Sequence, residues 1–187
     1  MTEAALHGTG AAPSPWVVRW AARVTAGGTV LDVACGAGRH ARWLAARGHP
    51  VLAVDRAPDI VDALAGVPGV ETMVADLEAG DWPLAGRRFA GVVVTNYLHR
   101  PLLPLLIDAL APDGVLIYET FSAGNEAYGR PANPAFLLQP GELLEAVHGR
   151  LDVLAYEDGR VATPKPAMIQ RICAIPGSRR ALQFDLS

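Results

Sequence analysis

The chain has 187 residues, of which 51% are hydrophobic and 19% charged, with a formal net charge of −3. This length suits one domain with a sizeable core, and this composition excludes an intrinsically disordered chain. Acidic and basic residues are mixed and no long basic run occurs, so the chain is not expected to bind nucleic acid.

The first two thirds of the chain alternate helical patterns with short apolar runs. A helix is predicted over residues 14–25, with Ser14 as its N-cap and Pro15 at its first position. The predicted strands that follow are residues 29–35, 51–55, 70–75, 89–96 and 114–120. The helices predicted between them are residues 37–48, ended by Gly48, residues 57–66 and residues 101–114. Continuous apolar strands separated by helices indicate a parallel sheet covered on both faces.

The last third has a different pattern. A helix is predicted over residues 140–149, and the runs 151–158 and 167–175 have only a short proline-containing connection between them. These two runs should pair antiparallel. We therefore predict one domain over residues 1–187, with its core at about 25–175. The fold class is α/β: three layers, doubly wound, Rossmann-like, with a mostly parallel seven-stranded sheet that ends in an antiparallel hairpin.

The stretch around the first predicted strand contains an unexpected acid. Asp32 lies inside a run that should be buried on both faces, and the glycine turn CGAGRHA follows it. Glycines at this edge of an open sheet let a ligand approach the backbone, and the next helix offers free N–H groups. Asp55 ends the second strand, where a carboxylate can accept from both hydroxyls of a ribose. The ligand is therefore expected to be a nucleoside-containing cofactor.

Two cofactors fit this arrangement. GAGRHA satisfies the dinucleotide pattern G-x-G-x-x-A, and Asp55 lies about 20 residues further on, so NAD is one candidate. However, Asp32 would repel a pyrophosphate, the chain has no room for a separate substrate domain, and a terminal hairpin is foreign to the dinucleotide fold. S-adenosylmethionine carries an ammonium and a sulfonium, so acidic groups near the turn favour its binding.

The joint pattern resembles the class I S-adenosylmethionine-dependent methyltransferases over roughly residues 25 to 175. The matching segments are DVACGAG, the acid Asp55, ADLE after the third strand and TNYLHRP after the fourth. Within that superfamily, RHARWLAARGHPVLAVD resembles the small tellurite-resistance methyltransferases. The resemblance implies a cofactor site formed by Asp32, Ala34, Gly36, Gly38, Asp55, Arg56, Asp76, Leu77 and Asn96.

The acceptor side is expected around the ends of the fourth and fifth strands. Tyr97 is interpreted as a wall of the methyl site, and His99 or Arg100 as groups that orient or deprotonate the acceptor. Glu119 is either a base with a raised pKa or the partner of Arg130, and pairing is preferred.

Residues 121–139 form a long irregular stretch, which is interpreted as a substrate lid. The lid residues expected to face the acceptor are Asn125, Tyr128 and Arg130.

The function predicted from the sequence is methyl transfer from S-adenosylmethionine to a small-molecule acceptor by in-line displacement. The acceptor classes considered are thiols, sulfide and metalloid oxyanions, and no metal is expected. No signal peptide and no run of transmembrane length occur, so a cytoplasmic protein that does not bind membranes is expected. The alternatives are an NAD-linked oxidoreductase and a non-catalytic module that binds S-adenosylmethionine. The oligomeric state stays open.

Overall fold

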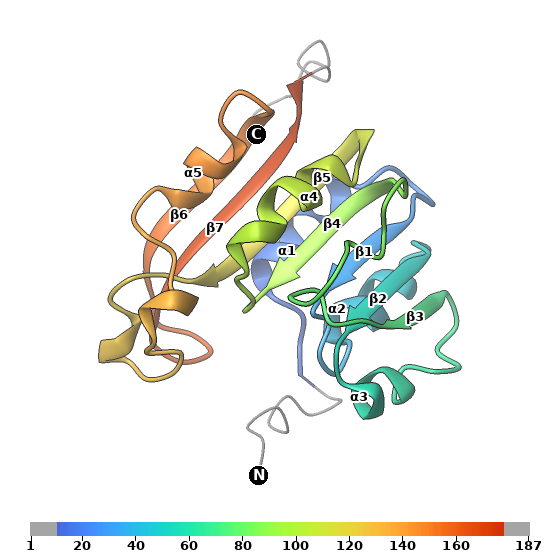
Figure 1. Ribbon diagram of the computed structural model, residues 1–187, viewed down its shortest axis with the longest axis horizontal. Coiled ribbons are helices and arrows are strands. Elements are labelled where there is room, and N and C mark those ends of the chain that lie inside the picture. Colours follow the sequence, from blue (N-terminus) through green and yellow to red (C-terminus); the bar gives the residue numbers. More distant parts are fainter. Residues whose placement is uncertain (1–10, 178–187) are drawn as a thin grey trace.

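The computed structural model describes residues 11–177, so both ends of the predicted 1–187 domain lie outside the described range. Its seven strands form one sheet in the order β3-β2-β1-β4-β5-β7-β6 (Figure 1). The strands are β1 (Val30–Val33), β2 (Val51–Asp55), β3 (Val70–Val74), β4 (Phe89–Thr95), β5 (Leu110–Phe121), β6 (Leu151–Val161) and β7 (Ala167–Pro176). The first five are parallel, and β7 pairs antiparallel with both β5 and β6. The predicted sheet and its terminal hairpin are confirmed.

Two layers of helices cover the sheet. The α-helices are α1 (Pro15–Trp20), α2 (Arg39–Ala45), α3 (Pro58–Asp62), α4 (Leu103–Asp108) and α5 (Glu142–Val147). Figure 1 shows α4 and α5 in front of the sheet and α1 behind it. Leu106 of α4 and Leu143 of α5 belong to the same buried cluster as Leu31, whereas Trp16 of α1 and Leu44 of α2 belong to the cluster of Val30. Because neighbouring residues of β1 enter opposite cores, the strand is buried on both faces, as its apolar sequence predicts.

The helices are shorter than predicted, and the reasons are local. The Ser14 hydroxyl accepts from the Trp16 N–H and Pro15 opens the helix, both as expected, but α1 ends at Trp20 and a 3₁₀ turn, η2 (Ala21–Arg23), follows. α2 begins only at Arg39, because Gly38 has the left-handed φ of 73°. Gly48 was predicted to follow the helix directly after its C-cap. The C-cap of α2 is Ala46, so Gly48 is the second residue after it.

The helix predicted over 101–114 is also split. A 3₁₀ turn, η3 (Arg100–Leu102), precedes α4, and residues 110–114 belong to β5. Between residues 11 and 177, no helix is long and apolar enough to cross a membrane.

Candidate active site

The carboxyl ends of β1, β2, β4 and β5 lie at one edge of the sheet, where ligands bind in open α/β folds. The chain order reverses beside β1, because β2 lies on one side of it and β4 on the other. The glycine turn leaves β1 at this point. The predicted ligand edge and the topological switch point therefore coincide.

The two glycines of the turn have different structural roles. A Cβ atom on Gly36 would meet no described atom within 4 Å, whereas one on Gly38 would lie 2.3 Å from the Leu64 side chain. Both glycines have positive φ angles, 52° and 73°. Gly36 therefore leaves open space where a ligand can approach the backbone, and Gly38 allows α2 to pack closely on Leu64. The predicted contact of Gly38 with the cofactor stays a prediction.

Asp32 is buried, with 1% of its surface exposed. Its Oδ2 atom has no hydrogen-bond partner among the described residues. Burial raises the pKa of its carboxyl to about 8, although the backbone of Ala41 and the charge of Arg39 oppose this shift. A buried polar atom without a partner is costly, so this oxygen is suited to a donor or a cation that the protein itself does not supply.

Asp55 joins the end of β2 to the glycine turn. Its Oδ2 accepts from the Gly36 N–H at 2.9 Å and its Oδ1 accepts from the Ala57 N–H at 3.1 Å. These two bonds fix the carboxylate, and each oxygen keeps a further lone pair for a ligand hydroxyl.

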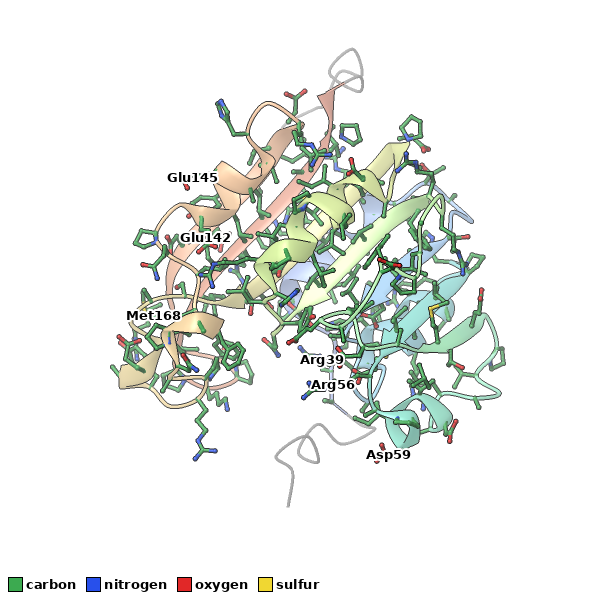
Figure 2. The ribbon with its side chains drawn as sticks, in the orientation of Figure 1. Arg39, Arg56, Asp59, Glu142, Glu145 and Met168 are labelled. Carbon is green, nitrogen blue, oxygen red and sulfur yellow. The ribbon has the colours of Figure 1, made fainter. Side chains whose placement is uncertain are left out.

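The predicted adenine-side residues lie beyond the next strand. Asp76 follows β3 and accepts from the Glu78 N–H at 2.9 Å, which forms a local turn. Leu77 is half-buried and packs against the core that contains Leu31, whereas Arg56 is exposed after β2. Figure 2 shows Arg39 and Arg56 at the same edge of the sheet. The cofactor roles of Arg56, Asp76 and Leu77 stay predictions.

A cavity of about 130 Å³ opens at the glycine turn. Its lining residues are Ala11, Ala34, Cys35, Gly36, Ala37, Arg39, Thr95 and Asn96. Three of the predicted cofactor residues, Ala34, Gly36 and Asn96, are therefore brought together there.

Arg39 was missed by the sequence analysis. It is the one charged side chain among the described residues that line this cavity. Burial lowers its pKa, and the nearby carboxylates of Glu119 and Asp32 oppose that effect. The signal that points to it is its place at the first position of the helix after the glycines.

Glu119 is held by two partners at the end of β5. The Ser14 hydroxyl donates to its Oε1 at 2.7 Å, and the Arg171 guanidinium donates to its Oε2 at 3.1 Å. The preferred prediction, an ion pair, is right in kind, but the partner in the structure is Arg171 of β7, where the sequence analysis expected Arg130. Both carboxylate oxygens of Glu119 are therefore already hydrogen-bonded within the protein.

His40 is buried and shares the partner Ser14 with Glu119. The Ser14 N–H donates to its Nε2 at 3.0 Å, so the neutral ring carries its proton on Nδ1, which lies 3.4 Å from the Thr95 hydroxyl. Burial, with the charge of Arg39, lowers the pKa of His40 to about 3. His40 therefore stays neutral and positions the chain that enters α1.

A second cavity, of about 230 Å³, lies between the ends of β4 and β5 and the segment after β5. Its lining residues are Glu78, Asn96, Tyr97, Leu98, Thr120, Phe121, Pro131 and Phe136. Asn96 lines both cavities, and its φ of 56° turns the chain sharply at the end of β4. The Asn96 N–H donates to the Glu119 carbonyl at 2.9 Å, which fixes this turn.

Tyr97 lines the second cavity, and its role as a wall of the methyl site stays a prediction. The Tyr118 hydroxyl donates to its carbonyl at 2.8 Å. Burial and the neighbouring Glu78 carboxylate raise the pKa of Tyr97 well above its usual range. Its hydroxyl is therefore a stable donor.

Arg100 faces the lid. Its guanidinium donates to both carboxylate oxygens of Glu142, at 2.6 and 2.9 Å, and to the carbonyls of Ala135 and Leu137, at 2.8 and 2.9 Å. These bonds make it a positioning residue of the segment around Phe136, and not a group free to orient an acceptor. His99 is half-buried and is not among the described residues that line either cavity.

The three predicted lid residues differ in burial. Asn125 is buried, donates to the Pro131 carbonyl at 3.0 Å and accepts from the Met168 N–H at 3.1 Å, so it ties the segment to β7. Tyr128 is 43% exposed, and the Arg160 guanidinium lies 5.6 Å from its ring centre. Arg130 is exposed.

None of Asn125, Tyr128 and Arg130 is among the described residues that line the second cavity. Phe136 and Pro131 are the lid residues that do.

Comparison with known proteins shows which proteins share this fold. Residues 30–114 match a family model described as a methyltransferase domain. The fold is that of the class I methyltransferases. TehB from Haemophilus influenzae superposes with a TM-score of 0.74 at 17% identity, covering 88% of this chain and 62% of TehB. The chain thus spans less than two thirds of the length of that neighbour.

Two further solved structures have the same fold. A TehB-like SAM-dependent methyltransferase from Corynebacterium glutamicum has a TM-score of 0.66 at 22% identity, covering 89% of this chain and 90% of that one. The 1,6-didemethyltoxoflavin-N1-methyltransferase of Burkholderia thailandensis has a TM-score of 0.64 at 21% identity, covering 87% and 76%. Among curated proteins none matches. The predicted class I methyltransferase fold is confirmed, and two of the solved structures that share it are TehB and a TehB-like protein.

Proposed function

We propose that this methyltransferase-fold chain uses S-adenosylmethionine to methylate a small molecule. The observation that carries the proposal is the charge arrangement at the glycine turn. Asp32 has a buried oxygen without a partner, Arg39 lines the cavity beside it, and Gly36 leaves open space between the backbone and a ligand. The carboxyl of Asp32, which a ligand ammonium would ionise, and the cationic Arg39 beside an open backbone suit the ammonium and carboxylate of an amino-acid group.

The remaining parts of the cofactor fit the neighbouring residues. Asp55 has a free lone pair on each fixed oxygen for the two ribose hydroxyls, and Asp76 and Leu77 follow the next strand at the adenine side. Two structures of the same fold, the toxoflavin methyltransferase and the glycopeptide N-methyltransferase MtfA, contain S-adenosylhomocysteine. When bound, S-adenosylmethionine supplies an electrophilic methyl group on a positively charged sulfur.

The residues of the chain contribute mainly by positioning. Asn96 lies between the two cavities, so an acceptor in the second cavity lies next to a cofactor in the first. Glu119 is occupied by Ser14 and Arg171, and His40 is buried and neutral, so neither is placed to act as a base. Holding the acceptor in line and excluding water account for the rate acceleration in this scheme.

Binding of S-adenosylhomocysteine to the wild-type protein and to Asp55→Ala, measured by calorimetry, tests the proposal. Hydrogen bonds to a charged group contribute about 1.5–3 kcal/mol each, so the affinity of Asp55→Ala should fall by at least about tenfold. Asp59→Ala is the matched control, because Asp59 is an exposed acid on the neighbouring α3 (Figure 2). Its affinity should stay at the wild-type value.

NADH in the same instrument tests the oxidoreductase alternative. Tighter binding of NADH than of S-adenosylhomocysteine would contradict the proposal, as would unchanged affinity in Asp55→Ala. The non-catalytic alternative fails once radiolabelled methyl transfer to any acceptor is detected. The cytoplasmic location stays a prediction from the sequence.

A further inference from the structure

The second cavity has the composition of a site for a ring. Three of its eight lining residues, Tyr97, Phe121 and Phe136, are aromatic, and Leu98 and Pro131 add apolar surface. Phe136 is 50% exposed, so an apolar face remains for a ligand to cover. Aromatic side chains that line a cavity favour flat, unsaturated ligands, because ring pairs stack or meet edge to face.

The charge of the cavity is negative. Glu78 is the one lining side chain with a formal charge within the described part of the chain, and its carboxylate faces the Tyr97 hydroxyl. The charged groups that act on Tyr97 beyond Glu78 are Asp76 and Arg56, so this group of three carries one net negative charge.

Arg100, which holds the lid from outside it, does not change this balance. Its guanidinium donates to the carbonyls of Ala135 and Leu137, on either side of Phe136, and its charge is neutralised by bidentate pairing with Glu142. An oxyanion in the second cavity would lose water beside a carboxylate and gain no cationic side chain from the lining residues.

The cavity is also small. Its volume of about 230 Å³ lies below the roughly 300–1,000 Å³ of pockets that hold drug-sized ligands. It therefore suits a molecule of one or two small rings.

We propose that the methyl acceptor is a small aromatic or heteroaromatic compound, neutral or cationic, and not an oxyanion. This inference rests on the proposed methyltransferase function and names its substrate class. Of the acceptor classes considered from the sequence, it drops sulfide and the metalloid oxyanions and narrows the thiols to those on an aromatic ring.

The acceptor presents a nitrogen or sulfur on or beside its ring. A lone pair of that atom forms the new bond to the methyl carbon while the carbon–sulfur bond of the donor breaks, and the breaking electron pair stays on the donor sulfur. The proton of an N–H or S–H acceptor leaves to Glu78, which is exposed and passes it to water. The ring lies against Phe121 and Phe136, and the Asn96 and Thr120 side chains offer neutral polar contacts.

Three probes of one shape and three charges test the inference: benzamidine, benzamide and benzoate. Their dissociation constants are measured by calorimetry on the full chain saturated with S-adenosylhomocysteine. We expect benzamidine and benzamide to bind, and benzoate to bind at least about fivefold more weakly than benzamidine, because the exposed carboxylate of Glu78 modestly attracts the one and repels the other. Glu78→Gln should narrow that ratio to within about threefold.

Glu145→Gln is the matched control. Glu145 is an exposed acid on α5, away from the cavity (Figure 2), and its substitution should leave the ratio unchanged. Phe136→Ala should weaken the two ring probes that bind by about fivefold or more, without changing the affinity for S-adenosylhomocysteine.

Two results would overturn the inference alone. One is benzoate binding as tightly as benzamidine to a protein that binds S-adenosylhomocysteine normally. The other is methyl transfer to selenite at a higher kcat/KM than to benzimidazole, a neutral N–H heteroaromatic. Failure of S-adenosylhomocysteine itself to bind would instead overturn the proposed function, so the two failures are distinguishable.

Discussion

The two cavities of this protein are built in opposite ways. The first is lined mainly by the short glycine turn, Ala34 to Arg39, and its other lining residues are Ala11, Thr95 and Asn96. Asp55 accepts from the backbone of this turn at Gly36. The second is formed by large side chains from segments far apart in the sequence, from Glu78 to Phe136. The comparison indicates that the first cavity, the proposed cofactor half, depends on local backbone geometry. The second cavity, the proposed acceptor half, depends on the ion pair between Arg100 and Glu142 that holds the lid segment.

The largest effect is expected at Gly36. A valine there would place its side chain in the open space at the glycine turn, so affinity for S-adenosylhomocysteine should fall by about 100-fold or more, or about 2.7 kcal/mol. The left-handed φ of 52° adds backbone strain of about 1–2 kcal/mol, so the melting temperature should also fall. Calorimetry and thermal unfolding measure the two effects separately.

Gly38→Val is the structural counterpart, because its Cβ would lie 2.3 Å from Leu64 in addition to the backbone strain. It should lose more stability than Gly36→Val. If Gly36→Val is the less stable of the two, the open space beside Gly36 is not a ligand cradle.

The Asp32 carboxyl should lose its proton when S-adenosylhomocysteine binds. The folded-state pKa of Asp32, about 8, lies above its ordinary value of 3.8, so the fold favours the protonated carboxyl. The stability linked to this proton is fully present below about pH 4 and is lost as pH rises through about 8. At pH 7 the free protein holds the proton, and a ligand ammonium near Asp32 would favour the carboxylate.

Binding of S-adenosylhomocysteine should therefore release about one proton at pH 7, and affinity should rise by up to about tenfold between pH 6 and pH 7. Calorimetry in buffers of different ionisation enthalpy counts the protons. Asp32→Asn should abolish the release, and Asp59→Asn should retain it. Equal proton release in wild type and Asp32→Asn would show that another group titrates.

The pattern of the proposed cofactor half is visible in the sequence because its residues are close to one another in the chain. An acid inside an apolar strand, two glycines and a second acid at the next strand end are visible without a structure. Arg39 was missed because arginine in a first helical turn is ordinarily exposed, and only the fold shows that it lines a cavity.

The acceptor half was predicted less well. Arg100, Glu119 and Asn125 were expected to face a ligand or the lid, since polar residues at strand ends usually do. Their partners Glu142, Arg171 and Met168 lie 42, 52 and 43 residues further along the chain. Pairings at such separations leave no periodic signal in a single sequence. The central strands β1, β2 and β4, in contrast, were predicted well because burial on both faces makes each run continuously apolar.

A moderate effect is expected at Arg100. Lysine keeps the charge but cannot bind Glu142 through two parallel bonds and two carbonyls at once, so the segment carrying Phe136 should loosen. We expect the acceptor KM of Arg100→Lys to rise by about fivefold, with unchanged affinity for S-adenosylhomocysteine. Arg150→Lys is the control, because Arg150 pairs with Asp108 away from both cavities. A change in kcat at constant KM would instead place Arg100 in contact with the reacting atoms.

The smallest effect is expected at Tyr128, which was predicted to face the acceptor. Its ring is 43% exposed and its described ring contact is Arg160, at 5.6 Å. An exposed contact of this kind contributes about 0.5–1 kcal/mol to stability, and the ring is not among the described residues that line the second cavity. Tyr128→Ala should therefore change acceptor kcat/KM by less than about twofold, while lowering the melting temperature slightly. Phe136→Ala on the same lid is the contrasting variant. If the two variants lose activity equally, the lid closes as one unit over the acceptor, and the division of its residues into lining and anchoring groups is wrong.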